Sequence, residues 1–171
     1  MTRMNMTPQT MVYSASNTTA TLVISTGTYA PGEVFGSNNG TTNGPGAIYL
    51  RAAMEPGGAG ELVTLTLAGL TSTFPFNIWL FNAPLALANT NGYTFTLTNE
   101  DPRKFLGVVE ITGTDYNTPA AGGFPMAYIG TGMTLFTAPT TQAIIAYMVP
   151  SSATTGDGLS PILTANFIHV S

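Results

Sequence analysis

The sequence predicts an all-β protein, a jelly-roll-like antiparallel β-sandwich with an extended N-terminal arm and one short helical turn. Short apolar and β-branched runs alternate with polar residues, which is the period-two pattern of strands. The 19 glycines and 12 prolines interrupt every helical period outside that one turn. Long loops at 36–46, 53–60 and 117–125 alternate with shorter turns, which favours a jelly roll over an immunoglobulin-like sandwich, the alternative topology.

The N-terminal arm is expected at residues 1–15, and residues 16–171 form one β-sandwich domain with no internal linker or repeat. Residues 1–10 are polar and show no clear period, so their first few positions are expected to fray. The arm also carries Met4, Met6 and Met11. Methionine side chains adapt to irregular apolar surfaces, which predicts that the rest of the arm contacts a partner.

Four runs have the composition or alternation of strands with at least one buried face. The runs at 20–25 and 48–52 are short and rich in β-branched or apolar residues. In 62–67, Val63, Leu65 and Leu67 share one face and two threonines share the other. The run at 93–98 alternates without a break after an Asn-Gly turn, which predicts a half-buried strand.

Three further runs, at 76–81, 143–149 and 162–168, are apolar on nearly both faces. A strand of this kind needs cover on both sides. In a sandwich the second sheet covers only the inner face, so the outer face must meet a loop, an arm or another subunit. We therefore expect a homo-oligomer, with a trimer as the first choice.

The helical turn is expected at 98–102, where Thr98 and Asn99 offer capping oxygens and Glu100, Asp101 and Pro102 follow. Two cations come next, and Gly107 is expected to close the turn. This order matches the rules for helix ends and the helix dipole.

Charged residues are scarce: four Lys or Arg and eight Asp or Glu in 171 residues, or 7%, against 44% hydrophobic residues. Ordinary soluble domains carry about a quarter charged residues. Large uncharged patches mark places where other chains bind, so the composition predicts a protein that works in an assembly.

Composition also excludes several functional classes. A net charge of −4 with four scattered cations argues against nucleic-acid binding, which needs several cations to displace phosphate counterions. With no cysteine there is no disulfide framework or thiolate metal site. No apolar run reaches the length of a membrane helix or a signal peptide, so we expect no membrane partner and synthesis in the cytoplasm.

No catalytic set is apparent, and no cofactor or metal is expected. The single histidine, His169, lies in a strand pattern and is expected to be packed. Asp157 lies between two glycines, as expected of a turn. Glu110 and Asp115 are compatible with a hydrolase that uses two carboxyl groups, but nothing else points to one. Tyrosines and Trp79 lie mainly in strand-like runs, where packing is a commoner role than sugar stacking.

The stretch 79–116, WLFNAPLALANTNGYTFTLTNEDPRKFLGVVEITGTDY, carries a recognisable pattern. It resembles a family of small virion proteins of tailed bacteriophages, through the LFN strand with its nearby proline, the acidic pair, the KFLGVV strand and the DY turn. Residues 29–36, YAPGEVFG, resemble the opening of the same family. Asn82 and Glu33 stand where aspartate is common in the family, and residues 1–28 have no counterpart.

The resemblance implies a capsid decoration (cement) protein that assembles as trimers on the outer surface of the virion and binds the major capsid protein, without catalysis. A head- or tail-fibre β-sandwich that binds host glycans is the alternative. The residues expected at the partner interface combine the arm methionines, the strand tryptophan and three cations: Met4, Met6, Met11, Arg51, Trp79, Arg103 and Lys104.

Overall fold

The computed structural model describes residues 13–22, 24, 27–35, 46–85, 94–98, 101–118, 123–156, 158 and 160–170. Eleven strands and two short 3₁₀ turns make up the regular structure of this part of the chain. In chain order they are β1 (Tyr13–Thr21), β2 (Gly27–Tyr29), β3 (Ile48–Arg51), β4 (Ala59–Ala68), β5 (Phe76–Phe81), η1 (Asp101–Arg103), β6 (Phe105–Ile111), η2 (Gly113–Asp115), β7 (Tyr116–Asn117), β8 (Met126–Phe136), β9 (Ala143–Pro150), β10 (Thr154–Gly156) and β11 (Ile162–Val170).

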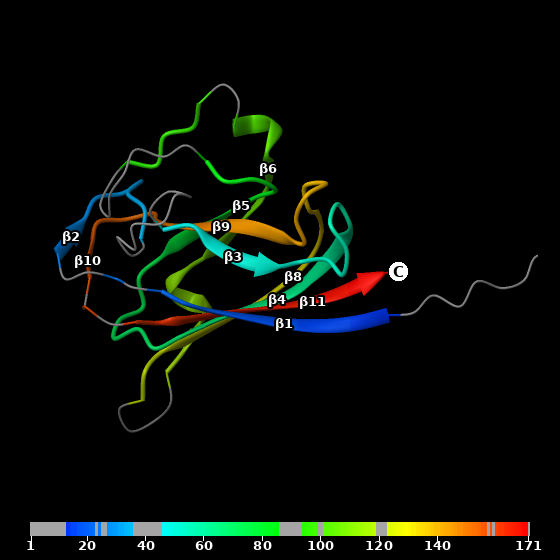
Figure 1. The fold of residues 1–171 in the computed structure, drawn as a ribbon. Helices are drawn as coiled ribbons and strands as arrows, with labels where there is room; N and C mark the ends of the chain where they lie inside the picture. The colour runs from blue at the N-terminus through cyan, green and yellow to red at the C-terminus, as the bar shows by residue number, and fades with distance from the viewer. Residues whose placement is uncertain are drawn as a thin grey trace, which may run out of the picture.

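Two antiparallel sheets face each other and form a sandwich (Figure 1). One has the order β1-β11-β4-β8-β7 and the other β3-β9-β5-β6, while β2 and β10 form a small separate ribbon. The strands β2, β7 and β10 have only two or three residues each. When the other eight strands are numbered one to eight along the chain, the two sheets have the orders 1-8-3-6 and 2-7-4-5. This is the double Greek key of a jelly roll, as the sequence predicted.

The main core lies between the two sheets, and strand alternation builds it. On β4, Leu62, Leu65 and Leu67 are buried, and on β5 the buried inner residues are Phe76, Ile78 and Leu80. The β4–β8 register shifts between Leu62 and Thr64. Gly132, at φ +68°, supplies the left-handed backbone conformation at this bulge. The shift explains why Val63, expected on the apolar face, is not part of the core.

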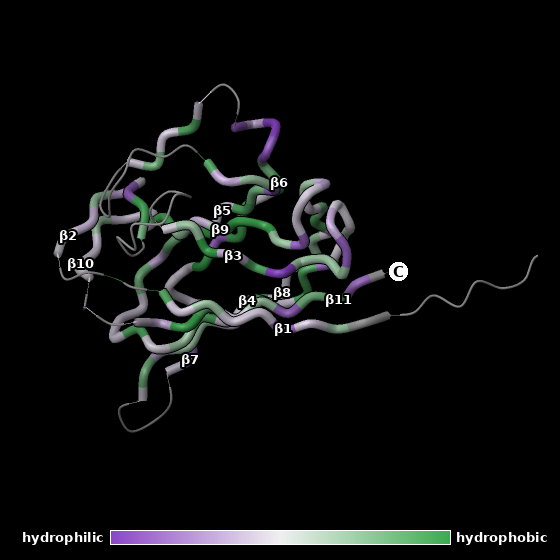
Figure 2. The backbone as a smooth tube through the Cα atoms, viewed as in Figure 1, coloured by the Kyte–Doolittle hydropathy of each residue, from purple (hydrophilic) through white to green (hydrophobic). Residues whose placement is uncertain are grey.

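On two of the three two-faced strands, β5 and β9, this chain's own loops cover the outer face, whereas Ile162 on the outer face of β11 stays exposed. The outer residues of β9, Ile145, Tyr147 and Val149, are buried in a second cluster together with Phe81 of β5. Val34 and the loop residues Leu85 and Phe95 pack on them. Figure 2 shows β9 and β5 as hydrophobic along their length, whereas the turn before β6 is hydrophilic. The apolar outer faces of β5 and β9 are therefore no argument for an oligomer, and the trimer stays a prediction.

Four details of the sequence-based prediction need correction. Residues 13–15, assigned to the arm, begin β1 and pair with β11. The described part of the run at 93–98 is no strand: Thr94 forms a single bridge with Glu33, and the chain lies as a loop on the outer cluster. Gly107 lies inside β6 and does not close a helical turn. The helical turn expected at 98–102 is a 3₁₀ turn at Asp101–Arg103, and a second one, η2, follows β6.

Candidate functional site

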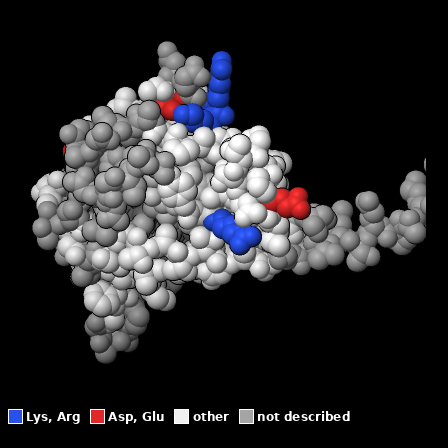
Figure 3. Space-filling view, viewed as in Figure 1, with Lys and Arg blue, Asp and Glu red and all other residues white. Residues whose placement is uncertain are grey.

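Three of the residues expected at a partner interface come together at the β6 edge of the second sheet. Trp79 lies on β5 opposite Val108 of β6, and Arg103 and Lys104 directly precede β6. Arg51 lies on β3, at the opposite edge of the same sheet. In Figure 3, Lys and Arg atoms gather at the top, near the turn before β6, with one group lower down and a largely uncharged surface elsewhere. Met4, Met6 and Met11 lie outside the described residues.

An aromatic cluster surrounds Trp79. The Trp79 ring centroid lies 5.3 Å from that of Phe95 and 5.6 Å from that of Phe105. Phe81 contacts the same two rings and Tyr147 below them. Phe105 stays 41% exposed and Val108 is similarly exposed. We call Trp79, Phe95, Phe105 and Val108 the aromatic edge; it rests on the buried rings of Phe81 and Tyr147, while Phe105 and Val108 meet solvent.

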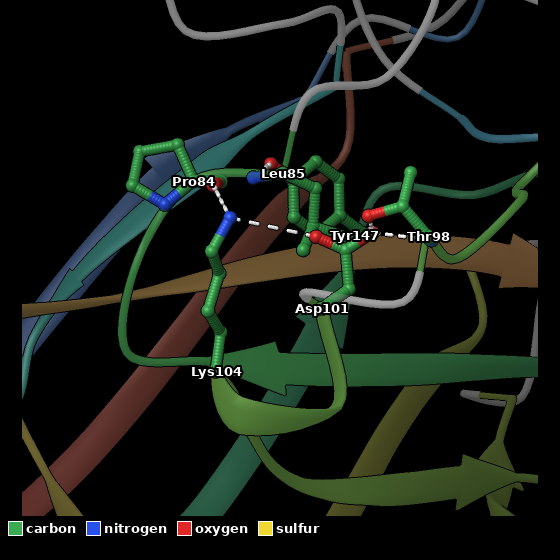
Figure 4. A network of polar contacts seen from close by, with 6 residues as sticks. All are labelled: Pro84, Leu85, Thr98, Asp101, Lys104 and Tyr147. Carbon is green, nitrogen blue, oxygen red and sulfur yellow. Dashed lines mark hydrogen bonds and ion pairs between the residues drawn. The ribbon is translucent and has the colours of Figure 1, made fainter.

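A buried carboxylate fixes the loops on which this edge rests (Figure 4). Asp101 is only 2% exposed, and its Oδ2 accepts hydrogen bonds from the Thr98 backbone N–H at 2.6 Å and the Thr98 hydroxyl at 2.7 Å. Lys104 Nζ lies 3.4 Å from Asp101 Oδ1 and donates to the Pro84 carbonyl oxygen at 3.2 Å. The loop after β5 is thereby tied to the turn before β6.

Burial of Asp101 favours its neutral form and raises its pKa, but the hydrogen bonds from Thr98 and the nearby Lys104 outweigh this effect. The net pKa of Asp101 is therefore lower than the ordinary value of 3.8. Because Lys104 already has two partners within the chain, its charge braces the loop more than it offers a contact to another molecule. Arg103 and Arg51 remain exposed.

Tyr147 of β9 also holds the loop after β5 in place. Its hydroxyl oxygen accepts a hydrogen bond from the Leu85 backbone N–H at 3.0 Å, and its ring packs edge-on against Phe81. Burial raises the pKa of Tyr147 to about 12. The aromatic edge is consequently a preformed surface held by hydrogen bonds and ring packing.

Glu110 and Asp115, the two carboxyl groups that a hydrolase would use, have different surroundings. Asp115 Oδ2 accepts bonds from the Thr112 backbone N–H and hydroxyl, both at 2.7 Å, and these bonds lower the pKa of Asp115. This is the arrangement of Thr98 and Asp101 repeated on the other side of β6. Glu110 is exposed and pairs in register with Asn77. The two T-x-x-D segments are a capping signal that the sequence carried and our prediction did not use.

His169 is packed, as expected. It is 2% exposed, stacks on Phe167 and lies 2.6 Å from Ser16 Oγ through its Nε2. Its Nδ1 is buried without a hydrogen-bond partner, so the acid that would orient a catalytic histidine is missing among the described residues. No group of three or more His, Cys, Asp or Glu suited to a metal occurs in this part of the chain, and none of its helices has the length and apolarity to cross a membrane.

The outer face of the first sheet differs in chemistry. Asn17, Asn166 and Thr64 lie in register across β1, β11 and β4, and Asn166 Nδ2 donates to Thr64 Oγ1 at 2.8 Å. The next row joins Thr19, Thr164, Thr66 and Tyr128. We call these two rows the threonine face. Tyr128, 62% exposed, lies at its β8 side, where Phe124 and Met126 are also exposed.

The chain matches no protein-family model, and no curated protein matches it significantly. The residues and surfaces described above are therefore the basis on which a function can be proposed.

Proposed function

We propose that this protein is a structural protein of a tailed-phage virion that decorates the outer surface of the capsid and stabilises it as a cement protein. The observation that carries the proposal is the aromatic edge: exposed aromatic and apolar side chains on a braced base, in a chain with hardly any charge. Such a surface binds through apolar burial, which contributes about 25 cal/mol per Å², and loses little to desolvation of charges.

The fold supports the proposal as an analogy. Double-sheet jelly rolls recur in viral capsid and lectin domains, although one fold hosts many functions. The resemblance of residues 29–36 and 79–116 to phage virion proteins points in the same direction. Binding at many equivalent sites would stabilise the closed shell by mass action, because the ligand favours the assembled state. The expected partner is the major capsid protein.

The decisive experiment compares heads that carry this protein with heads that lack it during heating and osmotic shock. We expect decorated heads to survive longer. A double variant, Phe105→Ser with Val108→Thr, tests the surface, since both side chains are exposed. Because the Phe105 ring also packs against Trp79 and Phe81, urea unfolding must first show that the variant is folded under the conditions of the binding assay. Each buried aromatic anchor contributes on the order of 1–2 kcal/mol to an interface, so binding should weaken by at least tenfold.

The matched control is Met126→Thr with Tyr128→Ser, two exposed residues on the other sheet. Decoration should be unchanged by the control and lost in the Phe105/Val108 variant. Equal decoration by both variants would reject the aromatic edge as the capsid contact. Equal survival of bare and decorated heads, with the protein located on tails by labelling, would reject the cementing function.

One observation favours the glycan-binding alternative. Phe124, Met126 and Tyr128 are exposed at alternate positions that run from the loop into β8. Exposed aromatic rings offer flat apolar faces on which sugar units stack. Titration of the protein with host surface oligosaccharides tests this, with Tyr128→Ala as the variant that should abolish binding. Absence of any heat of binding at millimolar sugar would discard the alternative.

A further inference from the structure

Strand β1 is an edge strand without the features that normally protect one. It runs for nine residues, Tyr13–Thr21, in an unbroken register with β11. Its sequence, YSASNTTAT, contains no charge, no proline and no glycine. Exposed edges of this kind are templates for pairing with another strand, and proteins usually blunt them with charges, prolines, bulges or short length.

The other three sheet edges carry such protection. At the far side of the same sheet, β7 has only two residues. In the second sheet, β3 has four residues and ends in Arg51. The last edge, β6, carries Glu110, and its register with β5 shifts between Leu80 and Phe81. Gly107 of β6 also lies against Met133 of β8, which closes that corner of the sandwich.

Hydrogen-bond alternation identifies which groups of β1 face outward. The Leu22 N–H donates to the Pro161 carbonyl oxygen at 2.8 Å, just beyond the strand. In an antiparallel ladder every second residue bonds to the same neighbour, so the even-numbered residues of β1 bond to β11. The N–H and C=O groups of Ala15, Asn17, Thr19 and Thr21 then point away from β11. Among the described residues no backbone partner meets them.

The hydrogen bond between β1 and the end of β3 involves an even-numbered residue of β1. The hydroxyl of Thr18, an even-numbered residue, donates to the Arg51 carbonyl oxygen at 3.3 Å. The side chains of Ala15, Asn17, Thr19 and Thr21 are exposed, and by strand alternation all four point to the side of the sheet that carries the threonine face. The edge and this face therefore form one continuous uncharged surface.

We propose that β1 pairs with β1 of a second copy of this chain, antiparallel about Asn17, so that two sheets join into one. In this register Ala15 of each copy lies opposite Thr19 of the other, and Asn17 lies opposite Asn17. Each such pair exchanges two backbone hydrogen bonds. A two-fold axis makes the contact self-complementary and closed at two copies.

A second copy fits this edge better than an unrelated strand for two reasons. Both sides of the contact are free of charge, so no cation or carboxylate is desolvated and no like charges oppose each other. The pairing also aligns the Asn and Thr rows of the two threonine faces, where cross-strand polar pairs add stability. A two-fold dimer replaces the trimer expected from the sequence as the state of the isolated protein, and its formation does not depend on capsid binding.

Two double variants of the same positions test the proposed register. Ala15→Lys with Thr19→Lys places lysines opposite each other across the two-fold axis. Ala15→Glu with Thr19→Lys places Glu opposite Lys. Because the side chains at both positions point to solvent, each variant should keep the native fold of a single chain, which thermal unfolding at low concentration verifies.

Sedimentation equilibrium at low salt should give twice the chain mass for the native protein, and at least a tenfold weaker association for the Lys/Lys variant. The Glu/Lys variant should associate at least as well as the native chain. Hydrogen exchange should slow with concentration at the amides of Ala15, Asn17, Thr19 and Thr21. A native monomer at 100 μM, open-ended aggregation, or an oligomer equally stable in both variants would overturn the proposal.

Discussion

The two outer faces of this sandwich come from the same charge-poor sequence, yet they are built differently. On β9 and β5 the outward side chains are Ile145, Tyr147, Val149 and Phe81, and the chain's own loops bury them. On β1, β11 and β4 the outward side chains are mainly Thr and Asn, and they bond to one another across strands. An absence of charge therefore has two meanings here: a second core on one side and an open polar surface on the other.

The two faces also differ in what holds their exposed side chains in place. The loops over β9 and β5 are fixed by the buried Asp101 and by Tyr147, so the exposed part of the aromatic edge stands on a rigid base. The threonine face rests directly on its strands and needs no such support. Substitutions on the first face should change stability, whereas those on the second should change only what binds there.

The largest effect is expected from Phe81→Ala. Phe81 is fully buried in the outer cluster, so truncation removes apolar contacts and leaves a cavity, at a cost of about 3–5 kcal/mol in the free energy of unfolding. Urea unfolding measures this, with Phe76→Ala of the main core as the matched control. If the Phe81 variant loses less than about 1 kcal/mol, the outer cluster is no second core and the comparison fails.

Asp101→Asn should have the next largest effect. The carboxylate accepts two bonds from Thr98 at almost no exposure, and an amide replaces only part of them, so about 1–3 kcal/mol should be lost. Asp115→Asn alters the same T-x-x-D geometry at a more exposed position and should cost less. Equal losses in the two variants would mean that burial of Asp101 adds nothing to its role.

Acid should weaken the protein through these two aspartates. Both folded-state pKa values are lower than the ordinary 3.8, so their stabilisation is complete above that pH and is lost as pH falls through the lowered values. Thermal unfolding between pH 5 and pH 2 should show this decline. The slope should flatten in the Asp101→Asn variant; an unchanged slope would contradict the assignment.

Alkali should act through Tyr147. Its folded-state pKa is raised to about 12 from the ordinary 10, so the stabilisation is present below pH 10 and is lost as pH rises from 10 to 12. Tyr116, whose pKa burial also raises, contributes in the same direction. In Tyr147→Phe the alkaline loss should shrink while the Leu85 N–H loses its acceptor. Absorbance at 295 nm during a pH titration follows the ionisation directly.

The smallest effect is expected on the threonine face. Tyr128→Thr removes an exposed ring and places threonine in a row of threonines, so the free energy of unfolding should change by less than about 0.5 kcal/mol. Urea unfolding beside Phe81→Ala gives the contrast between the faces. A loss above 1 kcal/mol would show that Tyr128 is part of a covered surface.

Sequence pattern alone located much of the fold. The runs at 62–67, 76–81, 143–149 and 162–168 fall in strands, and 48–52 does so up to Arg51, but only the first two residues of 20–25 belong to β1. The capping oxygens, acids and proline at 98–102 predicted a helical turn, which the structure has at Asp101–Arg103. It missed β8 as an alternating strand, because Gly130 and Gly132 interrupt its apolar period. It assigned a strand to 93–98, where the described residues form a loop: Phe95 packs on the outer cluster, but Leu97, the next apolar residue of the alternating pattern, stays exposed.

What the sequence by itself determined is the set of strands and the scarcity of charge, because both follow from local composition and the period of two. Only the tertiary structure decided which neighbour covers each face. The period-two alternation of a strand shows which side chains share a face. It does not show whether a sheet, a loop or another molecule covers that face. For the same reason, Trp79, Arg103 and Lys104 meet at the β6 edge and Arg51 does not: strand order, set by long-range pairing, decides which side chains share a surface.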